Sequence, residues 1–147
     1  MMSIWHSEVD IKKINEMNEN TMVKHCDIEI TRITDGSLEG QMIVSDKIKQ
    51  PFGIVHGGAN CVLAETLGSI AANLTCDPQQ AHAVGLSITT NHVKAVRNGI
   101  ITGIAKPVHL GGKIQVWDIT TFNNKDQITS KTSLTMAIIA RLNESQQ

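Results

Sequence analysis

The segment that most constrains the fold is residues 57–76, the one long stretch whose composition is typical of a buried helix. It is rich in Ala, Leu and Ile, and Asp77-Pro78 ends it. Its single charged residue is Glu65. A helix that is apolar or small on nearly all sides has to be surrounded by other elements. We expect one stripe to pack against a sheet and the other side to carry small or polar residues. The stripe is Leu63, Leu67, Ile70 and Leu74, and the other side is Cys61, Val62, Glu65, Gly68, Ser69 and Ala72.

Most of the remaining chain predicts strands. Alternation from Ile28 to Val44, with Asp35-Gly36 in its middle, is typical of a β-hairpin. After the long helix, four further strands are expected, with Gly- and Asn-rich turns between them: 84–93, 100–108, 113–122 and 128–140. A short amphipathic helix with Asp10 as its N-cap is expected over residues 10–18. This order predicts an α+β fold, in which an antiparallel sheet curls around one long central helix, as a single domain over residues 1–147.

Composition excludes several classes of function. The net charge is −1, and the 147 residues include two Trp, two Phe and no Tyr, which argues against a nucleic-acid partner. The longest apolar run, residues 136–140, is far shorter than a bilayer span, so no membrane partner is expected. The first residues lack the pattern of an export signal, which predicts a cytoplasmic location. Three widely spaced Cys indicate neither a disulfide framework nor a zinc knuckle.

Glu65 is the first candidate for chemistry, because a carboxylate on such a helix is costly unless it is paired or hydrogen-bonded. One interpretation is structural, with Glu65 held by a cation or by backbone donors from elsewhere in the fold. The other is catalytic, since burial raises the pKa of a carboxyl group toward the range of a general base. Ser69 follows one helical turn later on the same side.

The second candidate is His56-Gly57-Gly58, where a loop becomes the helix. The first amides of a helix have no partner inside it, and they lie at the positive end of the helix dipole. They can therefore stabilise negative charge on a carbonyl oxygen, as an oxyanion hole does. A plain helix start and a structural His56 are the alternatives. Metal binding fits less well, because the six His residues lack ligand spacing, and a Ser nucleophile on a strand-to-helix elbow is not indicated.

Together these residues resemble a known family. The segment Gln50-Pro51-Phe52-Gly53-Ile54-Val55-His56-Gly57-Gly58, followed after six residues by Glu65-Thr66-Leu67-Gly68-Ser69, is similar to the signature of hot-dog-fold acyl-CoA thioesterases of the PaaI-like group. Within that group, the chain resembles the bacterial branch that contains 1,4-dihydroxy-2-naphthoyl-CoA hydrolase of menaquinone synthesis and the proofreading thioesterase of enterobactin synthesis. The resemblance runs from Trp5 to the last strand.

The resemblance implies a hot-dog fold, a homodimer or homotetramer, and active sites between two subunits. Glu65 would be the catalytic carboxylate, as nucleophile or as base toward water, with Ser69 helping to place the water or substrate. Gln50, His56 and the Gly57 amide of the facing subunit would orient and polarise the thioester carbonyl. His92 matches a further polar position of the pocket.

The resemblance also implies where coenzyme A binds. The residues concerned are Lys94, His109, Gly111, Gly112 and Lys113, and no cofactor or metal is implied. Scattered Lys residues are equally typical of a solvated surface. The expected reaction is hydrolysis of an aromatic acyl-CoA thioester, with 1,4-dihydroxy-2-naphthoyl-CoA as one candidate substrate. The alternatives are proofreading of a thioester on an acyl or aryl carrier protein, and a non-catalytic acyl-CoA-binding module.

Overall fold

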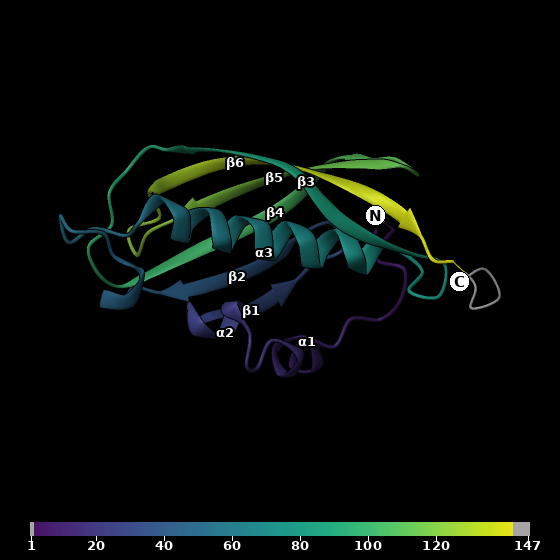
Figure 1. The fold of residues 1–147 in the computed structure, drawn as a ribbon, viewed down its shortest axis with the longest axis horizontal. Helices are drawn as coiled ribbons and strands as arrows, with labels where there is room; N and C mark the ends of the chain where they lie inside the picture. The colour runs from purple at the N-terminus through teal and green to yellow at the C-terminus, as the bar shows by residue number, and fades with distance from the viewer. Residues whose placement is uncertain (1, 143–147) are drawn as a thin grey trace.

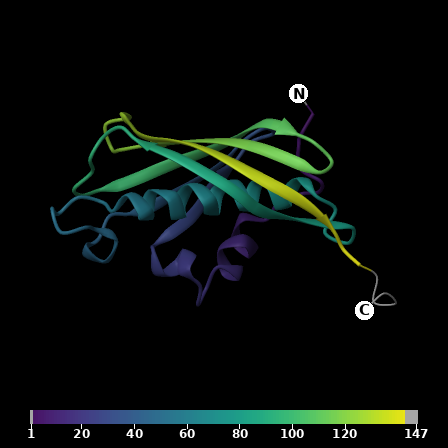
Figure 2. The same ribbon diagram turned by 45° about the horizontal axis from the view of Figure 1, so that its top comes forward.

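A six-stranded antiparallel sheet curls around one long helix in the computed structural model, which describes residues 2–142 (Figures 1 and 2). The strand order is β1-β2-β4-β5-β6-β3. The strands are β1 (Ile28–Ile33), β2 (Leu38–Ile43), β3 (Ala81–His92), β4 (Ile100–Leu110), β5 (Ile114–Phe122) and β6 (Ile128–Ala140). The helices are α1 (Ile11–Met17), α2 (Met22–His25), a 3-10 turn η1 (Asp46–Ile48) and α3 (Gly57–Thr75). The prediction of an α+β fold, with an antiparallel sheet curled around one long central helix, is therefore confirmed.

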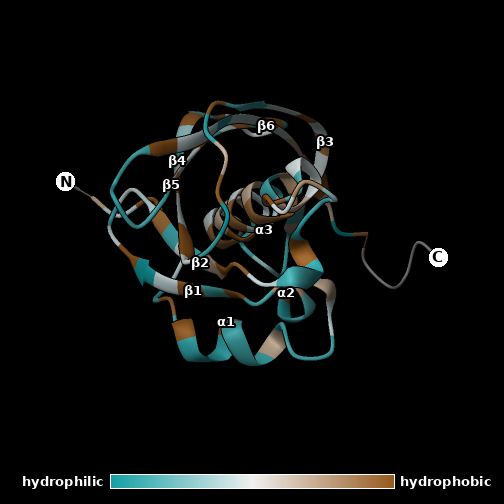
Figure 3. Cartoon of the chain, turned by 90° about the vertical axis from the view of Figure 1, so that its left-hand side faces the viewer, coloured by the Kyte–Doolittle hydropathy of each residue, from teal (hydrophilic) through white to brown (hydrophobic). Residues whose placement is uncertain are grey.

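Helix α3 sits deep in the concave face of the sheet because glycines on both elements let it approach closely. Gly40 on β2 and Gly103 on β4 leave room for the fully buried Leu67: a Cβ built on either glycine would lie 2.6 Å or less from a methyl carbon of that leucine. At a third contact the glycine is on the helix and the leucine on the sheet: Gly68 leaves room for Leu134 of β6. Viewed along its axis, α3 is enclosed by the curled sheet (Figure 3).

This enclosure corrects the predicted division of α3 into two sides. Leu63 and Leu67 are fully buried as expected, but Ala72 is fully buried too, and Gly68 faces β5 and β6. The curved sheet covers more of the helix than the flat sheet that a single stripe implies. Ile70 and Leu74 are only half-buried.

Strand β3 is one edge of the sheet, and it is unusually exposed for a strand with apolar residues. Among the strands of residues 2–142 it pairs with β6 alone, and a bulge at Leu86 interrupts the register between Gly85 and Ser87. Val84, Leu86 and Ile88 are all exposed. An apolar, unpaired edge of this kind is suited to pairing with another chain.

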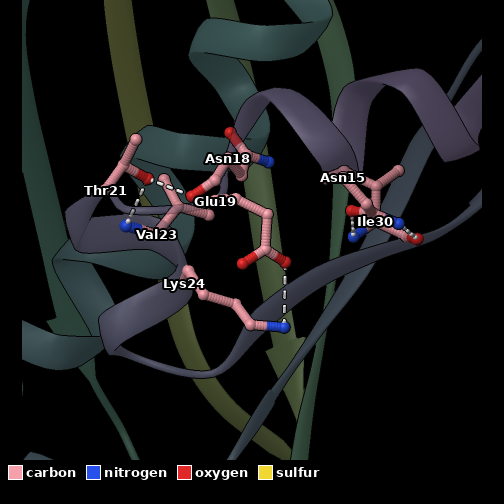
Figure 4. A network of polar contacts seen from close by, with 7 residues as sticks. All are labelled: Asn15, Asn18, Glu19, Thr21, Val23, Lys24 and Ile30. Atoms are coloured by element: carbon pink, nitrogen blue, oxygen red, sulfur yellow. Dashed lines mark hydrogen bonds and ion pairs between the residues drawn. The ribbon is translucent and has the colours of Figure 1, made fainter.

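The N-terminal helices lie beside β1, the other edge of the sheet (Figures 1 and 3). Asp10 caps α1 by accepting a hydrogen bond from the Lys13 amide (3.2 Å), as predicted. Asn15 anchors α1 to β1 through two hydrogen bonds to the backbone of Ile30, each 2.9 Å long (Figure 4). Helix α2, capped by Thr21, and η1 were not predicted; four and three residues are too few to produce a helical pattern. Over residues 2–142 no helix has both the length and the apolar character needed to traverse a bilayer.

Candidate active site

His56 forms the N-terminal cap of α3 with its own side chain. Its Nδ1 accepts a hydrogen bond from the Gly58 amide at 2.8 Å, and its backbone amide donates to Ile48 O at 2.8 Å. Because a backbone N–H can only donate, Nδ1 carries no proton, and the proton of the neutral ring is on Nε2. The ring is exposed. His56 therefore offers an N–H donor at the start of the helix.

The Gly57 amide is the free donor at this helix start. Among residues 2–142 no acceptor lies within hydrogen-bonding distance of it, whereas the next three amides are all bonded to His56. A Cβ built on Gly57 would lie only 2.9 Å from Nε2 of His92, so a side chain at this position would collide with the imidazole. The absence of a side chain keeps the amide open, and the helix dipole favours an anionic oxygen there.

A cavity of about 360 Å³ opens at this point. Gln50, Gly57, His92 and Lys94, four of the predicted site residues, line it together with Asn60 and Val96. The side-chain oxygen of Gln50 accepts a hydrogen bond from the Phe52 amide inside the turn, which leaves the Gln50 NH₂ group as a further donor. The cavity thus combines several hydrogen-bond donors with one cationic side chain.

Glu65 lies two helical turns further along α3 and does not line this cavity. Its carboxylate lies against Gly85 of β3, where a Cβ would overlap Glu65 Oε1. The carboxyl group is half-buried, and burial raises its pKa. In the described part of the chain it forms neither an ion pair nor a hydrogen bond with a side chain or backbone amide. The structural interpretation, a Glu65 held by a cation, therefore finds no partner there.

Within one chain, Glu65 and Gly57 cannot contact the same thioester. Eight residues of helix correspond to about 12 Å along the axis. The carboxylate of Glu65 and the amide of Gly57 are thus on one helix but too far apart to act on one thioester.

Ser69 lines a different cavity of about 430 Å³, between α1 and the C-terminal half of α3. Its walls are mostly apolar and include Ile14, Met17, Ile70 and Leu74. This cavity begins one turn beyond Glu65 on the same helix.

Of the remaining predicted residues, His109 lies near the end of β4, and Gly111, Gly112 and Lys113 form the turn between β4 and β5. This turn lies near the C-terminal end of α3, where Gln115 Nε2 donates to Thr75 Oγ1 at 2.8 Å. The full length of α3, about 28 Å, separates that end from Gly57. Gly111 is held tightly there: its amide donates to Ile114 O at 3.0 Å, and a Cβ would be 2.6 Å from His109 Nε2.

Two residues of the site were not found from the sequence. Asn60 contacts His92, which is 32 residues away along the chain, so no local pattern indicates the pair. Gly85 did leave a signal, because a glycine inside a strand pattern often marks a bulge or a close approach. Over the described residues, no group of three His, Cys, Asp or Glu side chains is arranged to hold a metal ion.

Comparisons with known proteins show the family of the chain. The Thioesterase superfamily matches residues 52–130. The chain is 43% identical over 136 residues to the 1,4-dihydroxy-2-naphthoyl-CoA hydrolase of Escherichia coli (strain K12). The aligned region covers 92% of this chain and 99% of the relative. The chain is 38% identical to the proofreading thioesterase EntH of Cronobacter turicensis, over 92% and 98% of the two chains.

Solved structures of thioesterases share the fold of this chain. Thioesterase HI1161 from Haemophilus influenzae superposes with a TM-score of 0.92 at 35% identity, covering 96% of this chain and 98% of that one. A mutant of thioesterase PA1618 from Pseudomonas aeruginosa superposes with a TM-score of 0.93 at 35% identity, and the match covers 95% of this chain and 100% of that one. The chain belongs to the thioesterase superfamily, and it is an enzyme of the thioester hydrolase class.

Proposed function

We propose that this thioesterase hydrolyses an aromatic acyl-CoA thioester, and that Glu65 and the Gly57 amide act on the same thioester from two copies of the chain. The observation that carries the proposal is the pairing of an unbonded amide at the start of α3 with a half-buried carboxylate of raised pKa at its middle. An oxyanion donor and a base are the two groups that acyl transfer to water requires.

The chemistry follows from these groups. The Gly57 amide, with the NH₂ group of Gln50 beside it, would hold the carbonyl oxygen as it gains negative charge. Glu65 would take a proton from water, whose oxygen attacks the carbonyl carbon. The C–S bond then breaks, Glu65 returns this proton to the sulfur, and coenzyme A leaves as the thiol while the carboxylate of Glu65 is restored. The alternative, direct attack by the carboxylate followed by hydrolysis of an anhydride, uses the same residues.

A two-fold pair of chains would complete the site. In two antiparallel α3 helices, Glu65 of one copy faces Gly57 of the other when the two-fold axis passes beside Cys61, the residue midway between them. Since Gly85 contacts Glu65 and the His92 ring contacts Gly57, the same axis would pass between Ile88 and Thr89 on β3. That point lies in the exposed apolar part of the β3 edge. The helix and the strand thus indicate one arrangement, a dimer formed through β3.

The arrangement also gives the substrate a path. The acyl group would enter the apolar cavity beside Ser69, just beyond Glu65. Lys94 lines the cavity at Gly57, and in the dimer the His109–Lys113 turn of the other copy would approach the same end. Lys94 of one copy and residues 109–113 of the other would then contact the phosphates of one coenzyme A. The E. coli relative makes 1,4-dihydroxy-2-naphthoyl-CoA the first substrate to test.

A second candidate keeps the chemistry and changes the thiol carrier. The similarity to the proofreading thioesterase EntH favours a thioester on an acyl or aryl carrier protein. The donor groups and Glu65 would act unchanged, because both carriers end in the same phosphopantetheine thiol.

The test is a panel of 1,4-dihydroxy-2-naphthoyl-CoA, benzoyl-CoA, short and long acyl-CoAs and loaded carrier proteins, with free thiol followed spectroscopically. We expect the highest kcat/KM on the naphthoyl thioester. Turnover no better than that of generic acyl-CoAs would reject this substrate, and a preference for loaded carrier protein would favour the second candidate. Glu65→Gln should abolish turnover while substrate binding is retained, and a wild-type rate in this variant would exclude Glu65 from the mechanism.

A further inference from the structure

Asn60 is a buried polar residue that the proposed chemistry leaves without a role. It lies on α3 one turn after Gly57, is only 6% exposed and lines the same cavity. Its Nδ2 lies 3.3 Å from Nδ1 of His92. Its Oδ1 is shielded from solvent and has no partner among the described residues. Because buried amides are normally hydrogen-bonded, an amide placed here at this cost requires an explanation.

The contact with Asn60 bears on which nitrogen of the His92 ring carries the proton. The nitrogen of the Asn60 amide, as placed in the structure, faces Nδ1 of His92, and because an amide nitrogen can only donate, Nδ1 is then the acceptor. The proton of the neutral imidazole is then on Nε2. This is also the atom of the ring that lies nearest to Gly57, 2.9 Å from the position of a Cβ, whereas the flanking carbons are at 3.2 and 3.4 Å. The Nε2–H group is therefore directed to the side of the cavity where the free Gly57 amide lies.

We propose that Asn60 is a positioning residue, which fixes His92 as the Nε2–H tautomer and turns that N–H toward the thioester oxygen held at Gly57. The proposal rests on the proposed function for the identity of the oxygen. It adds the His92 Nε2–H group to the Gly57 amide and the Gln50 NH₂ group as a donor of the oxyanion site, and it adds a residue that aims this donor. Neither His92 nor Gly57 could supply this orientation, because both sides of an unrestrained imidazole can carry the proton.

The opposite tautomer would work against the reaction. With the proton on Nδ1, Nε2 would present a lone pair to an oxygen that becomes negative in the transition state. That interaction is repulsive, whereas an N–H at the same place is stabilising. Since the carbonyl oxygen is less negative in the ground state, the tautomer affects kcat more than KM.

The experiment combines ring spectroscopy with kinetics. Nitrogen-15 NMR of the histidine rings, assigned with a His92→Ala variant, distinguishes a protonated from a bare ring nitrogen. We expect a bare Nδ1 and a protonated Nε2 in the wild-type protein. Asn60→Leu removes the donor and keeps the branching of the side chain, and Asn60→Ala is the second variant in case the larger leucine does not fit. Either should mix the two tautomers and lower kcat about tenfold with little change in KM.

Two controls separate positioning from general damage. Asn15→Leu removes a half-buried amide with two hydrogen bonds on α1, away from this cavity, and should leave the His92 signals unchanged. In a His92→Ala background, Asn60→Leu should cause no further loss of kcat, because Asn60 acts through the ring.

A protonated Nδ1 in the wild-type protein, unchanged ring signals in both Asn60 variants, or additive losses in the double variant would each overturn the proposal. Failure of the proposed function is a different result: ring signals as expected, but no thioester hydrolysed by the wild-type protein. In that case the assignment of Asn60 as the residue that fixes the His92 tautomer stands, while the oxygen it serves is another one.

Discussion

Gly85 gives the sharpest test of where the carboxylate of Glu65 has to be. A Cβ on Gly85 would overlap Glu65 Oε1 and lie 3.3 Å from Cδ and 3.7 Å from Oε2. Ordinary van der Waals contact requires about 3.4 Å or more, so Gly85→Ala forces the end of the Glu65 side chain to move by about 1 Å. The atoms that must move are the far end of a flexible side chain, and β3 is an exposed edge. The cost in stability is therefore small.

The effect on the reaction is large in comparison. A displacement of about 1 Å in a reacting group lowers the rate about 100-fold, because the base no longer meets the attacking water in line. We expect Gly85→Ala to reduce kcat by that factor, with KM and the free energy of unfolding nearly unchanged. The assay is thiol release under saturating substrate, beside urea denaturation.

Gly36→Ala is the matched control, since nothing lies within 4 Å of a Cβ at Gly36 and the position is in the β1–β2 turn. It should have wild-type kinetics. A wild-type kcat in Gly85→Ala, in a protein that Glu65→Gln still inactivates, would refute the reasoning: the carboxylate position against β3 would then not be the reacting one.

The remaining predictions concern pH, the core and assembly. Burial raises the pKa of Glu65 above its ordinary value of 4.5, so kcat/KM should fall with acid at a higher pH than an exposed Glu gives. The buried charge of Glu65 costs no stability below the pKa of the unfolded state, and its full cost is present above the pKa of the folded state. The free energy of unfolding of Glu65→Gln should therefore rise relative to wild type as the pH increases between these two pKa values. A difference that does not change with pH would contradict this reasoning. Leu67→Ala should lose about 4 kcal/mol in urea denaturation, because Gly40 and Gly103 have no side chains to refill the space, and a loss below about 2 kcal/mol would show that the helix resettles. Ile88→Lys should give a monomer by light scattering while Ile128→Lys, on another strand, does not; an unchanged mass would exclude β3 as the interface.

The fold was predictable because its main elements have strong local patterns. Helix α3 ends at Thr75, one residue before the predicted end, and the hairpin at Asp35-Gly36 forms as expected. Strand β3 begins at Ala81, earlier than predicted, since Ala81 to Ala83 have little preference for strands and are held there by pairing with β6. Gly68 was assigned to the wrong side of α3, because the curvature of a sheet is a property of the whole fold and leaves no mark at one position.

Without the family resemblance, the candidate site was predictable only where its residues are neighbours in sequence. His56 and Gly57 belong to one loop-helix unit, so their chemistry follows from the first turn of a helix. The contact of Asn60 with His92, and that of Glu65 with Gly85, join α3 to a strand and depend on tertiary packing. The meeting of Glu65 with Gly57 depends further on a second copy of the chain, and remains a prediction.

The 12 Å between Glu65 and Gly57 on one rigid helix has a consequence for measurement. Under the proposed function the shared site would form only in assembled pairs, so the rate per chain should depend on the protein concentration. Dilution through the dissociation constant would reduce specific activity in proportion to the fraction of pairs that remain, and restoring the concentration would bring it back.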